Sequence, residues 1–152
     1  KLMPPVTDLH ELLSTLSPFL EDGEYLFCTA PEPVALPLHL EPLATVREPE
    51  GLSLILSSEA ALRTGLSFEG PFRLISLRVQ SSLEAVGLTA AVSQALVAQG
   101  ISANMIAGYH HDYILVPADR ADDAMSTLLA LARTSALPEE ESLVMRVERK
   151  ST

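Results

Sequence analysis

The stretch that decides the fold covers residues 74–116 and reads LISLRVQSSLEAVGLTAAVSQALVAQGISANMIAGYHHDYILV. It opens on alternating apolar residues, the pattern of a strand, and continues with apolar residues at helical spacing before two further strand-like runs. In order, we predict a strand over 74–79, a polar loop over 80–82, a helix over 83–99, and strands over 101–108 and 112–116. The rest of the chain is interpreted around this β-α-β-β unit.

The ends of the predicted helix carry signals of their own. Ser81 and Glu84 have the Ser-x-x-Glu spacing of a capping box, in which two side chains bond free amides at a helix start. Gly100 stands where a left-handed residue commonly ends a helix. The sequence therefore predicts a helix that begins at Leu83 and ends at Gln99.

The other elements follow from caps, turns and alternation in the same way. The prolines between residues 31 and 42 predict an extended loop, because proline suits neither a helix interior nor a central strand. We predict a helix capped by Asp8, strands over 24–30, 44–48 and 52–56, and a helix capped by Ser57 and ended by Gly65. A linker over 67–71 then leads into the first strand of the central unit, which starts from Phe72. After that unit we predict a helix capped by Asp119 with Asp122, and a last strand through Leu143, Met145 and Val147.

These elements divide the chain into two α+β halves, residues 1–70 and residues 71–152, with the boundary in the predicted linker. The second half reads β-α-β-β-α-β, and the first half is an imperfect copy of it. The residues do not decide which strand completes each half. An exchange of strands between the halves is one of the alternatives.

The composition bounds the class of protein. At 152 residues with 47% hydrophobic residues, the chain can form one ordinary domain or two small ones that share a core. A formal net charge of -10 repels phosphate backbones and anionic headgroups, so we expect neither nucleic acid nor a membrane as a partner. No apolar run approaches the ~20 residues that span a bilayer. One cysteine, Cys28, suits a reducing compartment, and we expect a cytoplasmic protein.

No arrangement of side chains in the sequence demands catalysis. It contains no Gly-rich phosphate loop, cysteine pair, Gly-x-Ser-x-Gly turn or His-Glu-x-x-His motif, so we expect no enzyme, no catalytic residue and no cofactor. His110 and Asp112 could face the same side of an extended strand, but a hairpin turn explains His110-His111-Asp112 better than a metal site does. Cys28 lacks a neighbour that would lower its pKa, which favours inert burial.

Residues 81–89, SSLEAVGLT, and 99–106, QGISANMI, combine a polar loop, a glycine near a helix start, a helix ending in Gly-Ile and a strand ending in Met-Ile. This order resembles the ACT domain. It is similar to the regulatory end of aspartate kinases and, more closely, to small stand-alone tandem ACT proteins of the CASTOR type, which segment 109–117 also fits. The resemblance implies a ferredoxin-like βαββαβ fold in tandem, with antiparallel sheets and helices on one face. It also implies a homodimeric sensor that binds an amino acid or a similar small molecule between modules.

The resemblance places the ligand beside the loop after the first strand, the helix start and the second strand. A helix N-terminus can hold a carboxylate, and a side-chain carboxylate can hold an ammonium group. Aspartate kinases often have Asp or Asn where this chain has Ser81-Ser82, so the identity of the ligand does not carry over. The implied ligand-binding residues are Gln80, Ser81, Ser82, Glu84, Gly87, Asn104, Met105 and Ile106.

Several of these residues also have a purely structural interpretation. Ser81 and Glu84 can serve as helix caps, and Asn104 can bond to backbone. If Glu84 serves both as a cap and as a ligand contact, Glu84→Ala costs ligand affinity and about 1 kcal/mol of stability. The alternative function is a structural oligomerisation or protein-interaction module without a ligand, in which apolar side chains fill the module interface.

Overall fold

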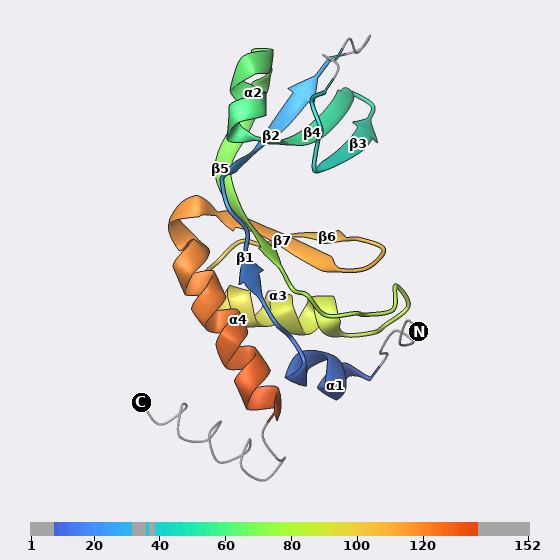
Figure 1. Ribbon diagram of the computed structural model, residues 1–152, viewed down its shortest axis with the longest axis vertical. Helices are drawn as coiled ribbons and strands as arrows, with labels where there is room; N and C mark the ends of the chain where they lie inside the picture. Colours follow the sequence, from blue (N-terminus) through green and yellow to red (C-terminus); the bar gives the residue numbers. More distant parts are fainter. Residues whose placement is uncertain (1–7, 32–35, 37–38, 137–152) are drawn as a thin grey trace.

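One long strand, β5 (Ser67–Ser76), runs through both halves of the molecule in a computed structural model that describes residues 8–31, 36 and 39–136. It belongs to a seven-stranded antiparallel sheet with the order β3-β4-β2-β5-β7-β6, in which β1 also pairs with β5. Figure 1 shows α2 beside the upper half of this sheet and the other helices around the lower half. The α+β class, the antiparallel sheet and the tandem ferredoxin-like arrangement are confirmed.

The described elements lie close to the predicted ones at most positions. They are α1 (Leu9–Ser14), β1 (Phe19–Leu20), β2 (Tyr25–Ala30), β3 (Ala44–Glu48), β4 (Gly51–Ser57), α2 (Ser58–Thr64), β5, α3 (Leu88–Ala98), β6 (Asn104–Ala107), β7 (Asp112–Pro117), the 3-10 turn η1 (Ala118–Arg120) and α4 (Ala121–Ala136). The Ser57 hydroxyl accepts a bond from the Ala60 amide, and Gly65 ends α2 in the left-handed conformation, as predicted. The predicted strand through Leu143 lies outside the described residues.

The first half consists of β2, β3, β4 and the start of β5, with α2 on one face. Leu26 and Cys28 of β2 face α2, where they form a core with Leu54, Leu56 and the alanines of that helix. Tyr25 and Phe27 lie on the opposite face, as the alternation along the strand predicts. Leu36 and Leu40, which lie between β2 and β3 in the chain, pack against the core under α2.

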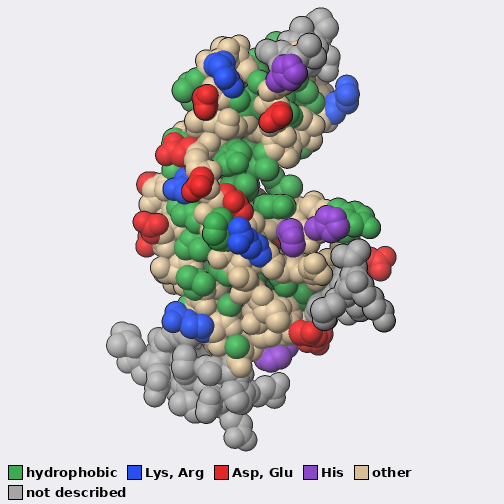
Figure 2. Space-filling view, viewed as in Figure 1, with side chains coloured by type: hydrophobic (Ala, Val, Ile, Leu, Met, Phe, Trp, Pro, Cys, Tyr) green, Lys and Arg blue, Asp and Glu red, His purple; other side chains and the backbone are tan. Residues whose placement is uncertain are grey.

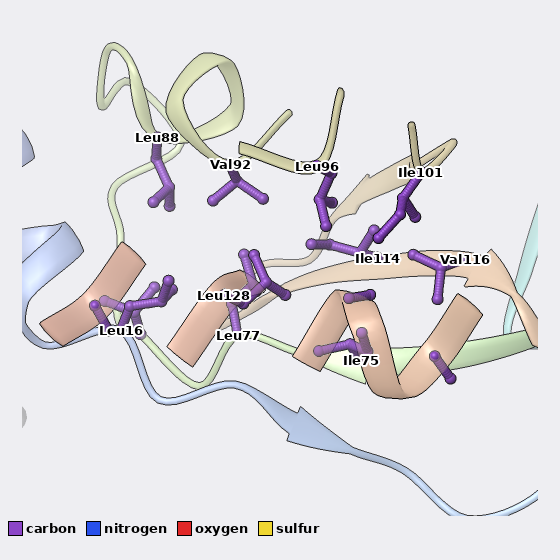
Figure 3. Close-up of a cluster of buried hydrophobic side chains, with 14 of the residues drawn as sticks. Leu16, Ile75, Leu77, Leu88, Val92, Leu96, Ile101, Ile114, Val116 and Leu128 are labelled. Atoms are coloured by element: carbon purple, nitrogen blue, oxygen red, sulfur yellow. The ribbon is translucent and has the colours of Figure 1, made fainter. Parts of the chain in front are cut away.

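The second half is completed by the N-terminal segment of the chain. In a βαββαβ unit the last strand pairs with the first, and here β1 pairs with β5 antiparallel, Phe19 opposite Ser76. Leu12 and Leu16 of the same segment are buried in one cluster with Val92 of α3 and Leu128 of α4. Figure 3 shows Leu16 facing this cluster of side chains from the sheet and both long helices. The exchange between halves that the sequence left open is thus present.

Four predicted boundaries are wrong. The last helix is not capped by Asp119, which lies in the 3-10 turn η1 before α4, and the strand predicted over 101–108 begins at Asn104. The other two errors concern glycine. The region predicted as a linker over 67–71 is the start of β5, because Gly70 continues the strand at φ 140 while it packs closely against Leu26. The helix predicted from Leu83 begins at Leu88, because Gly87 takes φ 103 and interrupts helical geometry there. The division of the chain between residues 70 and 71 falls inside β5 and stays a prediction.

The packing of α1 predicts a large stability cost for a substitution near the N-terminus. Leu12→Ala should lower the free energy of unfolding by about 2 to 5 kcal/mol, since it leaves a cavity among well-packed side chains. The control is Leu62→Ala on the outer side of α2, where the side chain is 66% exposed, with an expected change below about 0.5 kcal/mol. Urea denaturation measures both. Equal stability of the two variants would show that α1 does not belong to the core of the second half.

Candidate functional site

The loop between β5 and α3 is tied to the start of β7 by a side-chain hydrogen bond. The Ser81 hydroxyl donates to Asp112 Oδ2 at 2.7 Å. Just after the end of β5, the Leu77 amide donates to the Asp112 carbonyl at 2.9 Å. Asp112 itself is the first residue of β7 and pairs with Ala107 across the β6–β7 hairpin. A fixed carboxylate therefore stands beside the loop that leads to α3.

The start of α3 has amide groups that no side chain caps. Gly87 is the N-cap residue, and no side-chain hydrogen bond is made there. The first intrahelical bond runs from the Ala91 amide to the Gly87 carbonyl at 2.9 Å. The amides that precede Ala91 in the first turn thus lack an intrahelical partner, and they form the positive end of the helix dipole. Such an end is suited to a carboxylate or another small anion.

Gly87 is required at this position for two reasons. Its φ of 103 disfavours any residue with a side chain. A Cβ on Gly87 would also lie 2.9 Å from Leu9 Cδ2, so α1 packs directly against the start of α3. Leu9 therefore covers the loop at Gly87.

The capping box predicted from Ser81 and Glu84 is wrong. Both residues lie outside α3, which begins at Leu88. The Ser82 hydroxyl accepts a bond from the Glu84 amide at 3.1 Å, and the Ala85 amide donates to the Ser82 carbonyl at 3.0 Å, so these residues form a local turn. Glu84 is exposed, and its side chain is free to point at a ligand.

The structure brings only part of the predicted ligand-binding set together. Ser81, Ser82, Glu84 and Gly87 share one loop, with Gln80 exposed at its start. Asn104 pairs with Leu115, three positions along β7 from Asp112, which is about 10 Å at the rise of a strand. The eight-residue set as a whole stays a prediction.

The three predicted residues of β6 have different surroundings. Asn104 Nδ2 donates to the Leu115 carbonyl at 3.5 Å, the backbone partner that a polar residue in this strand was expected to find. Met105 packs on the helix-covered core, and Ile106 packs on the opposite face of the sheet. Asp112, which is not among the predicted ligand-binding residues, lies beside the loop through its hydrogen bond with Ser81. The sequence predicts Asp112 at the end of a hairpin turn and the start of a strand, as observed, but only the strand register could have located its side chain beside this loop.

The hairpin between β6 and β7 has apolar and aromatic side chains at its tip. The Gly108 amide donates to the His111 carbonyl at 2.9 Å, which closes the turn, and the Tyr109 and His110 rings meet edge to face with centroids 4.8 Å apart. Figure 2 shows green and purple side chains projecting there. Tyr109 is 83% exposed, and Leu83 and Val86 of the loop before α3 are 68% and 83% exposed. This end of the second half therefore has exposed apolar groups.

The described residues offer little support for a metal site, a reactive cysteine or a membrane-spanning helix. Among residues 8–31, 36 and 39–136, no group of three or more His, Cys, Asp or Glu side chains could hold a metal ion. Burial raises the pKa of the Cys28 thiol, so the thiol stays protonated at neutral pH. The helices of the described part of the chain are all too short or too polar to cross a membrane.

The revised position of Glu84 changes what its removal should do. Glu84→Ala is expected to alter the free energy of unfolding by less than about 0.5 kcal/mol, since an exposed loop side chain outside the helix contributes little. Ser57→Ala, which removes the N-cap of α2, should cost about 1 kcal/mol. Thermal denaturation followed by circular dichroism compares the two. A loss of about 1 kcal/mol in Glu84→Ala would restore the capping role that the sequence suggested.

Comparisons with known proteins agree with this architecture. A family model of the ACT domain matches residues 4–73, and a second ACT domain model matches residues 69–130. A crystal structure of a Vibrio cholerae protein of unknown function, described as a possible transport protein, is 49% identical with a TM-score of 0.74 and covers 82% of this chain and 95% of that one. No curated protein sequence matches the chain.

Two aspartokinase structures share the fold at low identity. The aspartokinase alpha and beta subunits give a TM-score of 0.61 at 12% identity, with 77% of this chain and 98% of that chain covered. Aspartokinase III from E. coli, in complex with aspartate and ADP, gives 0.57 at 13% identity, with 76% of this chain and 33% of that chain covered. With its two consecutive matches to the same family, the chain belongs to the ACT domain family and carries two ACT domains in tandem.

Proposed function

We propose that this protein is a non-catalytic regulatory module that binds a free amino acid or a similar small metabolite at the start of α3. The observation that carries the proposal is the uncapped first turn of α3, which lies on the loop that Ser81 ties to Asp112. A positive helix end and a fixed carboxylate in one region match the two charged groups of an amino acid.

Each group of the ligand has a partner in this arrangement. The ligand carboxylate accepts bonds from the free amides of α3, and the ammonium donates to Asp112 or to the exposed Glu84. Ser81 is a positioning residue, since its hydrogen bond fixes the Asp112 carboxylate. Gln80, Ser82 and Gly87 belong to the same loop, and the residues of β6 are left out of the proposed site because Asn104 lies along the strand from it.

The regulatory part of the proposal rests on the shared strand. The loop that would hold the ligand follows directly on β5, and the same strand is hydrogen-bonded to β2 in the first half. A shift of the loop on binding is thereby passed to the first half. Among the related folds, aspartokinase III from E. coli was solved in complex with aspartate and ADP. We further propose a cytoplasmic homodimer, in line with the buried free Cys28 and the exposed apolar tip.

The exposed apolar side chains favour a second candidate function. Leu83, Val86 and Tyr109 are each more than two thirds exposed beside the proposed site. Exposed apolar side chains at one end of a domain suit a subunit contact. The second candidate is therefore an oligomerisation module that holds subunits together without a ligand.

Thermal unfolding in the presence of each free amino acid tests the first proposal. A ligand at about 100 times its dissociation constant stabilises the folded state by about 2.7 kcal/mol, which raises the midpoint by several degrees in a chain of this size. Asp112→Asn should reduce that shift, because the ammonium loses its charged acceptor, with an expected loss of affinity of about tenfold or more. Asp119→Asn, the same charge change at an exposed residue, should leave the shift as in the natural chain.

The outcomes separate the two candidate functions. A single amino acid that stabilises the natural chain and not Asp112→Asn supports the sensor. No shift with any amino acid, together with a dimer in light scattering that Val86→Glu dissociates, contradicts the sensor and favours the oligomerisation module.

A further inference from the structure

A separate cavity lies in the first half, on the face of the sheet opposite to α2. Its volume is about 340 Å³, large enough for a small organic molecule. Five of its lining residues, which are Phe27, Thr29, Ser53, Ser67 and Glu69, occupy equivalent positions on β2, β4 and β5. The other two lining residues, Cys28 and Phe68, are strand neighbours that alternate with them, and the Cys28 side chain belongs to the core under α2. The cavity is therefore formed by the open side of the sheet, away from the loop before α3.

The strand register arranges the polar side chains of this cavity in a row. Thr29 of β2 pairs with Ser53 of β4 on one side and with Ser67 of β5 on the other. Side chains at such positions stand about 5 Å apart on one face of a sheet. Phe27, two residues before Thr29, pairs with Glu69. Three hydroxyl groups thus lie next to an aromatic ring and a carboxylate.

Several groups that line the cavity can accept hydrogen bonds or attract a cation but cannot donate. The Ser53 hydroxyl donates its proton to Glu48 Oε1, so only its lone pairs remain for a bound molecule. The Glu69 carboxylate is exposed and can only accept, and none of the ion pairs between described residues includes it. The face of the Phe27 ring is the negative part of its quadrupole. The lining contains no Lys, Arg or His.

We propose that this cavity binds a small organic ammonium ion, such as an aliphatic primary amine. An ammonium group has three donors and no acceptor, which matches a carboxylate, a hydroxyl that has already donated its proton, and neighbouring hydroxyls. An ammonium over the Phe27 ring gains a cation–π contact. The net charge of -10 also favours cations over anions at this surface. The site is distinct from the one proposed at α3 and lies on the other half of β5.

Isothermal titration calorimetry of the full chain with 1,4-diaminobutane tests the proposal, and 1,4-butanediol serves as the uncharged probe of equal length. We expect saturable binding of the diamine and none of the diol. Glu69→Gln should weaken diamine binding at least tenfold. Glu59→Gln removes the same charge from α2, on the other side of this half, where the side chain is 86% exposed, and should bind as the natural chain does.

Further variants separate a local site from general charge attraction. Thr29→Val keeps the shape of the side chain and removes one hydroxyl, and it should weaken diamine binding several-fold while the melting temperature stays unchanged. Asp112→Asn should have no effect on the diamine, which keeps this result independent of the amino-acid site. Equal weakening by Glu69→Gln and Glu59→Gln, unchanged binding in Glu69→Gln, or equal binding of diamine and diol would each overturn the proposal.

Discussion

Backbone hydrogen bonding along β5 is the constraint on which the rest of the structure depends. A strand inside a sheet must pair its N–H and C=O groups on both edges. Residues 67–72 of β5 pair with β2, residues 72–76 pair with β7, and residues 75 and 76 also pair with β1 on the edge opposite to β7. Phe72 pairs with both Tyr25 and Pro117, where the two sets overlap. One strand is thus the last of the first ACT domain and the first of the second, and the two domains form one sheet.

Local signals were sufficient for much of the fold. Ser57, Gly65 and the alternation along β2 were interpreted correctly, because caps and half-buried strands depend on neighbours in sequence. The start of α3 was missed because Ser81 and Glu84 imitate a capping box, while Gly87 takes a left-handed conformation and packs against Leu9 of α1. A contact between residues so far apart in sequence cannot be inferred from a helical pattern.

In the candidate site too, features set by neighbouring residues could be predicted from the sequence, and those set by strand pairing could not. The loop after β5 and a glycine near a helix start could be taken from the sequence, and the structure places Ser81 and Gly87 there. Asp112 could not be included, because its position depends on the register of β7 against β6 and on the bond from Ser81. The row of hydroxyl groups across Ser53, Thr29 and Ser67 likewise exists only once three strands are aligned.

The packing of α1 and β1 on the second domain has a consequence for how the chain acquires its structure. During synthesis from the N-terminus, Leu12 and Leu16 emerge long before α3 and α4, the helices they pack against. Until those helices are made, this apolar segment has no native partner and must stay unpaired or associate elsewhere. Its closing contacts span most of the sequence, and such non-local contacts slow folding. The second ACT domain can therefore complete its core only after α3 and α4 are made. Because α1 and β1 precede the first domain in the chain while α3 and α4 follow it, the second domain is not a continuous piece of chain that could be exchanged between proteins as a unit.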